Sequence, residues 1–154
     1  MAHTIVISIT DPGKPEAKID PAVKDILRLT FEDVEPDVWE AIGVTLTYNA
    51  FSLDQAKRIH NFWYKHNNSD VRTLIVHCEA GISRSAGVAK VLAEISGITL
   101  VSSITHSNRH VENLLREAFS LPAYPYASRA KNTKSVFGSS LPNSTSVFFS
   151  RLKD

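Results

Sequence analysis

The stretch TLIVHCEAGISRS, residues 73–85, decides the fold of this chain. Its first six residues form an apolar run of the length expected for a strand buried on both faces of a parallel sheet. Beyond Ser85 the apolar residues recur at helical spacing, and Gly97 favours the left-handed conformation that ends a helix. The stretch therefore predicts a buried strand, a tight loop and a helix over residues 85–96.

The residues before this unit predict two further strands. Residues 3–9 (HTIVISI) alternate in polarity and are rich in β-branched side chains, and the Asp-Pro-Gly sequence at 11–13 then forms a turn. Residues 26–31 (ILRLTF) predict a second strand, which leads into the acidic segment 32–37 (EDVEPD).

Two more helices are predicted from apolar spacing and end signals. Ser52 and Gln55 form a capping-box pair at the start of a helix that runs to about Asn67. A last helix is expected over residues 108–119. The intervening residues 38–51 fit either a helical turn (VWEAI) or a short strand (VTLTY).

The composition limits the class of protein. With 154 residues, of which 43% are hydrophobic, the chain can build one soluble domain with its own core. A net charge of +1 argues against a protein that coats nucleic acid or an anionic membrane with positive charge. No apolar run approaches the roughly 20 residues that cross a bilayer, so no membrane-spanning role is expected. The single cysteine and the lack of a secretory leader predict a reducing, cytoplasmic location.

The two ends of the chain differ in composition. Residues 1–121 contain all the strongly periodic segments and are predicted to form the domain. Residues 122–154 are rich in Ser, Asn, Pro and Lys and are predicted to form a C-terminal tail. Apolar patches at 136–137 and 147–149 leave two alternatives open, a loose appendage or a tail pinned to the domain.

The loop between the central strand and its helix has the features of an anion site. A helix N-terminus presents unpaired N–H groups and a partial positive charge, and a loop wrapping into it can cradle a tetrahedral oxyanion such as phosphate. The helix terminus and the nearby guanidinium of Arg84 favour the nucleophilic thiolate form of Cys78. We therefore expect Cys78 to act as nucleophile and Arg84 to bind two phosphate oxygens with its planar fork.

The other residues of this loop have predicted roles as well. The phosphate-binding loop is expected to comprise Glu79, Ala80, Gly81, Ile82, Ser83 and Arg84. Gly81 suits a tight turn in which a side chain would obstruct the anion. The Ser85 hydroxyl could donate to the cysteine sulfur and ease its departure, and His77 is expected to order the loop through hydrogen bonds. Ser83 and Ser85 also fit the helix N-cap.

The cysteine and two of the histidines also have simpler interpretations. A lone cysteine after an apolar strand is usually a small buried hydrophobe, but the arginine, glycine and serine that follow Cys78 reverse that expectation. His106 and His110 lie four residues apart and could bind a metal from one helical face. Because no third or fourth ligand has suitable spacing, no metal site is predicted.

The nine residues HCEAGISRS (77–85) resemble the His-Cys-x-x-Gly-x-Ser-Arg-Ser signature of dual-specificity and related protein tyrosine phosphatases. A weaker similarity covers residues 26–119, where LRLTFEDVEP (27–36) resembles the segment before the acidic loop in compact prokaryotic and viral-type members. The resemblance implies an α/β fold with a central, mostly parallel sheet flanked by helices on both faces. It also implies two-step dephosphorylation of a protein or peptide through a phosphocysteine, without a metal or other cofactor.

The resemblance also implies a general acid, usually an aspartate on a mobile loop. At the position where much-studied compact members carry it, this chain has no carboxylate. Asp33 is the candidate, because it follows the strand 26–31 and matches the Phe-x-Asp pattern of the prokaryotic-type branch. Glu35, Asp37 and Asp54 remain rivals, although Asp54 also fits a first-turn carboxylate that stabilises a helix dipole.

Three functions are therefore compared. The first is hydrolysis of phosphotyrosine, and of phosphoserine or phosphothreonine, in proteins or peptides. The second is dephosphorylation of RNA 5′ ends or small molecules, which the negative charge of Glu79 disfavours for highly charged substrates. The third is a pseudophosphatase that binds phosphorylated partners but turns over poorly, a role that would need the arginine but not the cysteine and Ser85.

Overall fold

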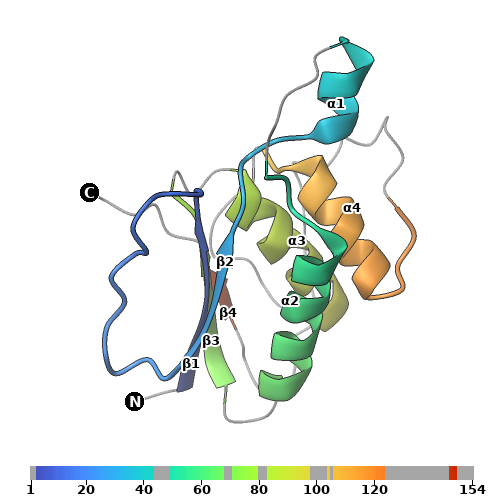
Figure 1. Cartoon of the computed structure of the whole chain (residues 1–154). Coiled ribbons are helices and arrows are strands. Elements are labelled where there is room, and N and C mark those ends of the chain that lie inside the picture. Colours follow the sequence, from blue (N-terminus) through green and yellow to red (C-terminus); the bar gives the residue numbers. More distant parts are fainter. Residues whose placement is uncertain are drawn as a thin grey trace.

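The computed structural model describes residues 3–43, 49–67, 71–79, 83–97, 104, 106–123 and 146–148. The elements in chain order are β1 (His3–Thr10), β2 (Asp25–Thr30), α1 (Pro36–Ala41), α2 (Leu53–His66), β3 (Val71–His77), α3 (Arg84–Ser96), α4 (Arg109–Ala118) and β4 (Ser146–Phe148). The predicted strands and long helices are thus confirmed, with small shifts at their ends. The molecule has an α/β fold (Figure 1).

The two ambiguous regions have different outcomes. Within 38–51 the helical turn is found as part of α1, whereas the alternative strand VTLTY falls at 44–48, outside the described residues. In the tail, β4 pairs with β3, so one apolar patch contributes a strand to the sheet. The other patch, at 136–137, lies outside the described residues.

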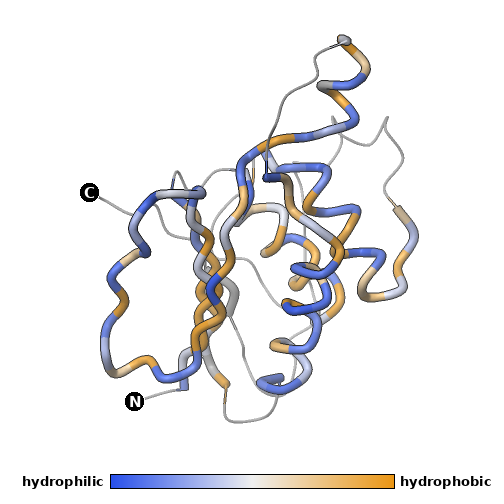
Figure 2. The backbone as a smooth tube through the Cα atoms, in the orientation of Figure 1, coloured by the Kyte–Doolittle hydropathy of each residue, from blue (hydrophilic) through white to orange (hydrophobic). Residues whose placement is uncertain are grey.

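The sheet is parallel throughout its described strands, in the order β2-β1-β3-β4. β1 is central and pairs with β2 through Ile5–Thr10 and with β3 through His3–Ser8. Figure 2 shows the hydrophobic colouring concentrated along these strands. Because all three strands run the same way, their C-terminal ends meet at one edge of the sheet, which is where Asp11, Phe31 and Cys78 follow.

The long helices α2, α3 and α4 all lie on one face of this sheet (Figure 1). This face receives the odd-numbered residues of β1 and their buried partners on the helices, among them Ile5, Ile7, Ile9, Ile59, Leu92 and Leu115. Among the described helices none is both long and apolar enough to cross a membrane.

The opposite face carries no helix within the described part of the chain, which differs from the two-sided arrangement implied by the resemblance. Residues 11–24, which connect β1 to β2, run over this side instead (Figure 1). Arg28 of β2 donates to the Ala17 carbonyl and pairs with Glu16 of this connection. Polar side chains on this face explain why a polar connection covers it and not an apolar helix face. Ser8, Arg28 and His77 form one row across the three strands here.

Local signals account for the helix ends. The capping box predicted for α2 is present, with the Ser52 side chain accepting from the Gln55 backbone and the Gln55 side chain accepting from the Ser52 backbone. Gly97 ends α3 in the left-handed conformation, with φ of 63°. Asn108 caps α4 by accepting from the Val111 N–H at 3.0 Å.

Helices α3 and α4 approach each other closely at Gly87. A Cβ atom there would lie 3.0 Å from the Asn108 carbonyl oxygen and 3.3 Å from the Val111 side chain. The missing side chain therefore allows the N-terminus of α4 to sit against the first turn of α3.

We predict that Gly87→Ala lowers the free energy of unfolding by about 1 kcal/mol, as measured by urea denaturation. Alanine is about 1 kcal/mol more favourable than glycine inside a helix, but overpacking a fixed contact costs about 1–3 kcal/mol. A net increase in stability, as expected from helix propensity alone, would contradict this close packing.

Candidate active site

Cys78 lies directly after the last residue of β3 and is 1% exposed. Its Sγ atom is 3.2 Å from the Oγ atom of Ser85, the second residue of α3. Ser85 is fully buried, and it lies inside the helix because Ser83 occupies the N-cap position. The pair is arranged so that a serine hydroxyl can donate a hydrogen bond to the sulfur.

Arg84 is the first residue of α3, and one nitrogen of its guanidinium group forms two hydrogen bonds. Nη1 donates to the Phe31 carbonyl at 2.7 Å and to the Asp11 carboxylate. The residue is 4% exposed, and its Nε atom is buried without a hydrogen-bond partner in the described part of the chain. A buried, partnerless N–H on a fixed guanidinium is a ready donor for a bound anion.

Asp11 was not among the candidate residues. It follows β1 in the Asp-Pro-Gly turn, where Lys14 pairs with Glu79 at 3.1 Å. Burial acts to raise the pKa of Asp11, but the positive charges of Arg84 and Lys14 and the hydrogen bond from Arg84 outweigh it, so the pKa is lower than usual. Two acids, Asp11 and Glu79, thus lie beside two bases, Arg84 and Lys14. The lowered pKa keeps Asp11 ionised at neutral pH.

Asp33 is brought next to the cysteine loop, although it is far away in sequence. Its Oδ1 atom accepts from Ser83 Oγ at 2.9 Å and from Asn108 Nδ2 at 2.8 Å. The side chain is otherwise exposed to solvent. One carboxylate oxygen is therefore fixed by two donors, and the other has no hydrogen bond within the described residues.

Ser83 corrects one expectation. It occupies the N-cap position of α3, but its side chain forms no capping hydrogen bond. Its backbone has helical dihedral angles (φ −116°, ψ −64°), whereas a capping serine normally has an extended backbone. The hydroxyl donates to Asp33. The Ser83 carbonyl accepts from the backbone N–H groups of Gly87 and Asn108.

Asn108 is the second residue that the sequence analysis missed. It is 1% exposed and donates both to Asp33 and to the Val34 carbonyl at 3.1 Å, while its own oxygen caps α4. The available signal was its place before a periodic helix, which indicates a cap. Nothing local indicated that the amide nitrogen reaches a loop distant in sequence.

The rival acids lie in other environments. Glu35 accepts from the Arg109 backbone N–H at 2.7 Å, at the start of α4. Asp37 lies in the first turn of α1 and Asp54 in the first turn of α2. These positions suit carboxylates that stabilise helix N-termini.

His77 also differs from its expected role. It is 3% exposed, and neither of its ring nitrogens has a hydrogen-bond partner in the described part of the chain. Because successive strand residues face opposite sides, His77 lies on the face of Ser8, its cross-strand partner, and Cys78 on the helix face. The expected hydrogen bonds from His77 are therefore not found with those residues of the loop that the structure describes.

The remaining loop residues have separate outcomes. Glu79 is exposed and pairs with Lys14. Ala80, Gly81 and Ile82 lie outside the described residues, so their predicted phosphate contacts stay predictions. Outside the loop, the Nε2 atom of His110 donates to the Phe51 carbonyl oxygen at 2.7 Å.

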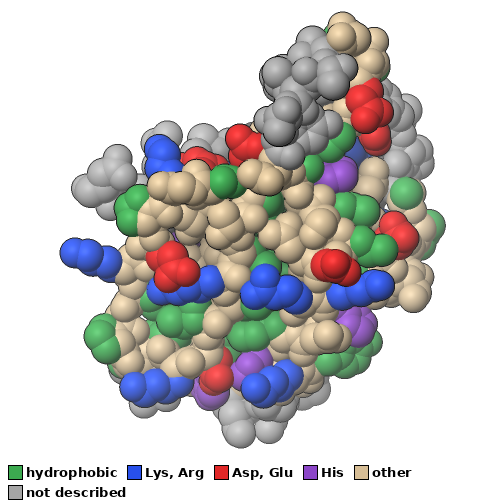
Figure 3. Space-filling model, viewed as in Figure 1, with side chains coloured by type: hydrophobic (Ala, Val, Ile, Leu, Met, Phe, Trp, Pro, Cys, Tyr) green, Lys and Arg blue, Asp and Glu red, His purple; other side chains and the backbone are tan. Residues whose placement is uncertain are grey.

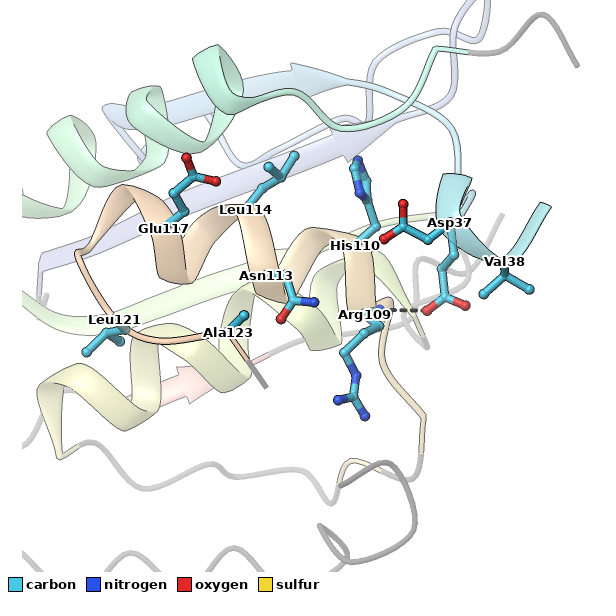
Figure 4. Close-up of a pocket in the computed structure, with 10 residues that line it drawn as sticks. Asp37, Val38, Arg109, His110, Asn113, Leu114, Glu117, Leu121 and Ala123 are labelled. Carbon is cyan, nitrogen blue, oxygen red and sulfur yellow. Dashed lines mark hydrogen bonds between the residues drawn. The ribbon is translucent and has the colours of Figure 1, made fainter. Parts of the chain in front are cut away.

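A cavity of about 540 Å³ lies beside α4 and adjoins the segment that carries Asp33. Figure 4 shows Arg109, His110 and Glu117 along α4, with Asp37 of α1 at one end of the cavity and Leu121 near the other. Cys78 is not among its lining residues. Glu35, two residues after Asp33, is among the residues that line the cavity.

Comparison of the chain with protein-family models, with curated proteins and with solved structures found no match.

The buried His77 predicts how stability depends on pH. Burial lowers the pKa of His77, and the positive charge of Arg28 lowers it further. The unfolded chain therefore binds a proton at a higher pH than the folded protein, and stability is lost as the pH falls below the ordinary histidine value of about 6.5.

We predict that the free energy of unfolding in urea decreases between about pH 7.5 and about pH 5.5, and that the decrease is smaller in His77→Gln. His66 acts in the same direction, because burial lowers its pKa despite the opposing charge of Asp25. The variant and the wild type are therefore compared at the same pH values. An equal decrease in both proteins would rule out His77 as a source.

Proposed function

We propose that this protein is a phosphomonoester hydrolase that acts on phosphotyrosine, and also on phosphoserine or phosphothreonine, in proteins or peptides. The observation that carries the proposal is the guanidinium of Arg84, which is anchored through Nη1 and whose buried Nε has no hydrogen-bond partner among the described residues. Arg84 precedes Ser85 at the start of α3, where the Ser85 hydroxyl lies against the Cys78 sulfur. The resemblance of residues 77–85 to the phosphatase signature supports the same assignment.

In the first step the Cys78 thiolate attacks phosphorus. An S–P bond forms while the P–O bond to the leaving group breaks, and Arg84 binds the phosphoryl oxygens through the open side of its fork. Asp33 gives a proton from its unbonded oxygen to the leaving oxygen, while Ser83 and Asn108 hold the other oxygen in place.

In the second step water attacks phosphorus and Asp33 takes its proton. The S–P bond breaks, and the electron pair returns to sulfur as a thiolate. Ser85 donates to this thiolate at the 3.2 Å separation seen here, which stabilises the leaving group. Ser85 therefore acts mainly in the second step.

The surroundings favour a singly phosphorylated residue over a polyanionic substrate. Three carboxylates lie around the loop, those of Asp11, Asp33 and Glu79. Two nearby cations are already paired, Arg84 with Asp11 and Lys14 with Glu79. The cavity adjoining the Asp33 segment offers room for residues that flank the phosphorylated side chain. A nucleophilic cysteine also works best in a reducing compartment, so we place the protein in the cytoplasm.

The role of Asp33 predicts a dependence on the leaving group. Asp33→Asn is expected to lower kcat for a phosphotyrosine peptide by about 10²-fold or more, but to change it little for p-nitrophenyl phosphate, which needs little protonation. Steady-state kinetics with both substrates over a range of pH measures this.

The matched controls are Asp37→Asn and Asp54→Asn, which remove the rival carboxylates and are expected to leave the ratio of the two rates unchanged. Cys78→Ser is expected to abolish both reactions. If the wild type binds the peptide without hydrolysing it, the chain is a phosphate-binding pseudophosphatase. If it prefers RNA 5′ ends or small phosphates, the proposed substrate class is wrong.

The anchoring of Arg84 gives a second test. Asp11→Ala removes both the charge and the acceptor, whereas Asp11→Asn removes the charge and keeps an acceptor for Nη1. We expect kcat/KM for p-nitrophenyl phosphate to be about tenfold lower in Asp11→Ala than in Asp11→Asn, because a loose guanidinium binds the transition state less well. Lys14→Ala, in the same turn, controls for disturbance of the turn. Equal values for the two Asp11 variants would show that only the charge matters.

A further inference from the structure

Three potential metal ligands from three different elements meet at the edge of the sheet opposite to Cys78. His3 begins β1, Asp25 begins β2 and His66 ends α2. One ligand atom from each lies within 4.8 Å of the other two. Figure 3 shows acidic and histidine side chains next to each other at the lower edge of the visible face, with Lys or Arg side chains on either side.

The carboxylate of Asp25 lies between the two imidazoles. Its Oδ2 atom is 2.8 Å from His3 Nε2, and its Oδ1 atom is 3.7 Å from His66 Nε2. A tetrahedral ion with bonds of about 2.0–2.1 Å holds neighbouring ligand atoms about 3.3 Å apart. The two separations lie on either side of that value and end on different oxygens of Asp25. Small side-chain rotations would bring both imidazole nitrogens and one carboxylate oxygen onto one ion.

Hydrogen bonding accounts for only one of the two contacts that Asp25 makes with the histidines. The contact between His3 and Asp25 is a hydrogen bond, but 3.7 Å is too long for one between Asp25 and His66. The His66 side chain is only 10% exposed and forms no hydrogen bond within the described part of the chain. The Phe62 ring, with its centroid 4.6 Å from that of His66, packs against the imidazole. A buried imidazole that faces a carboxylate without reaching it is suited to share an ion with it.

We propose that His3, Asp25 and His66 bind one Zn²⁺ ion. Two imidazole nitrogens and one carboxylate oxygen match the preference of zinc, whereas calcium and magnesium prefer all-oxygen sites. His3 and Asp25 are 41% and 30% exposed, so water can occupy the fourth position. The neighbouring cations Lys24 and Lys65 are exposed, and salt screens their repulsion.

The bound ion would stabilise the fold rather than take part in phosphate chemistry. It joins the start of β1 and β2 to the end of α2, at the edge of the sheet away from Cys78. Because the ion binds only where the three elements are assembled, it shifts the unfolding equilibrium by mass action. The proposal does not depend on the phosphatase assignment.

The test is a calorimetric titration of the full chain, carrying no histidine tag, with ZnCl₂. The parent protein is Cys78→Ser, because a thiolate would itself bind zinc. We expect one ion per chain, and a rise in the thermal unfolding temperature with added zinc. In the same background, His3→Ala, Asp25→Asn and His66→Gln are each expected to weaken binding at least about tenfold.

His106→Gln is the matched control, because it removes an exposed histidine outside the group and is expected to leave binding unchanged. If His66→Gln does not fold, the two exposed positions carry the test. Absence of binding by the parent would overturn the proposal. Binding that survives both His3→Ala and Asp25→Asn without loss of affinity would overturn it as well.

Discussion

A buried guanidinium and its two acceptors connect the elements around the candidate active site. Arg84 is nearly inaccessible to solvent, and Nη1 reaches both Asp11, which follows β1, and the Phe31 carbonyl, which follows β2. Removing one partner of a buried charge usually costs about 3–5 kcal/mol, so such an arrangement is strongly constrained. The parallel sheet makes it possible, because the C-terminal ends of neighbouring strands lie side by side.

A second set of contacts reaches the same loop from α4. The absence of a side chain at Gly87 lets Asn108 approach α3, and Asn108 then donates to Asp33 while its backbone N–H donates to the Ser83 carbonyl. Helix packing and the orientation of the candidate acid are therefore linked. A change in the spacing of α3 and α4 would move Asp33 relative to the cysteine loop.

The two edges of the sheet have different character. At the C-terminal edge, Arg84 is anchored through Nη1, and its Nε has no partner among the described residues and is available to bind an anion. At the N-terminal edge the proposed zinc ligands connect the first residues of two strands to the end of α2. The connection 11–24 runs between these edges over the sheet face that carries no described helix.

The sequence by itself determined the elements and the position of the reactive loop. Strand alternation, the capping box at Ser52 and the terminating Gly97 are local signals, and each was found as expected. The sequence alone also placed Cys78 after a strand and Arg84 at the start of a helix, because only neighbouring residues are needed to specify that order. Only the tertiary structure decided which distant residues meet there. Asp11, Asn108 and the group around Asp25 depend on strand order and helix packing, which residue spacing does not encode. The same reason explains why Ser83 bonds to Asp33, which is distant in sequence. His77 differs, because the alternation of side chains along β3 is local and puts it on the sheet face of Ser8.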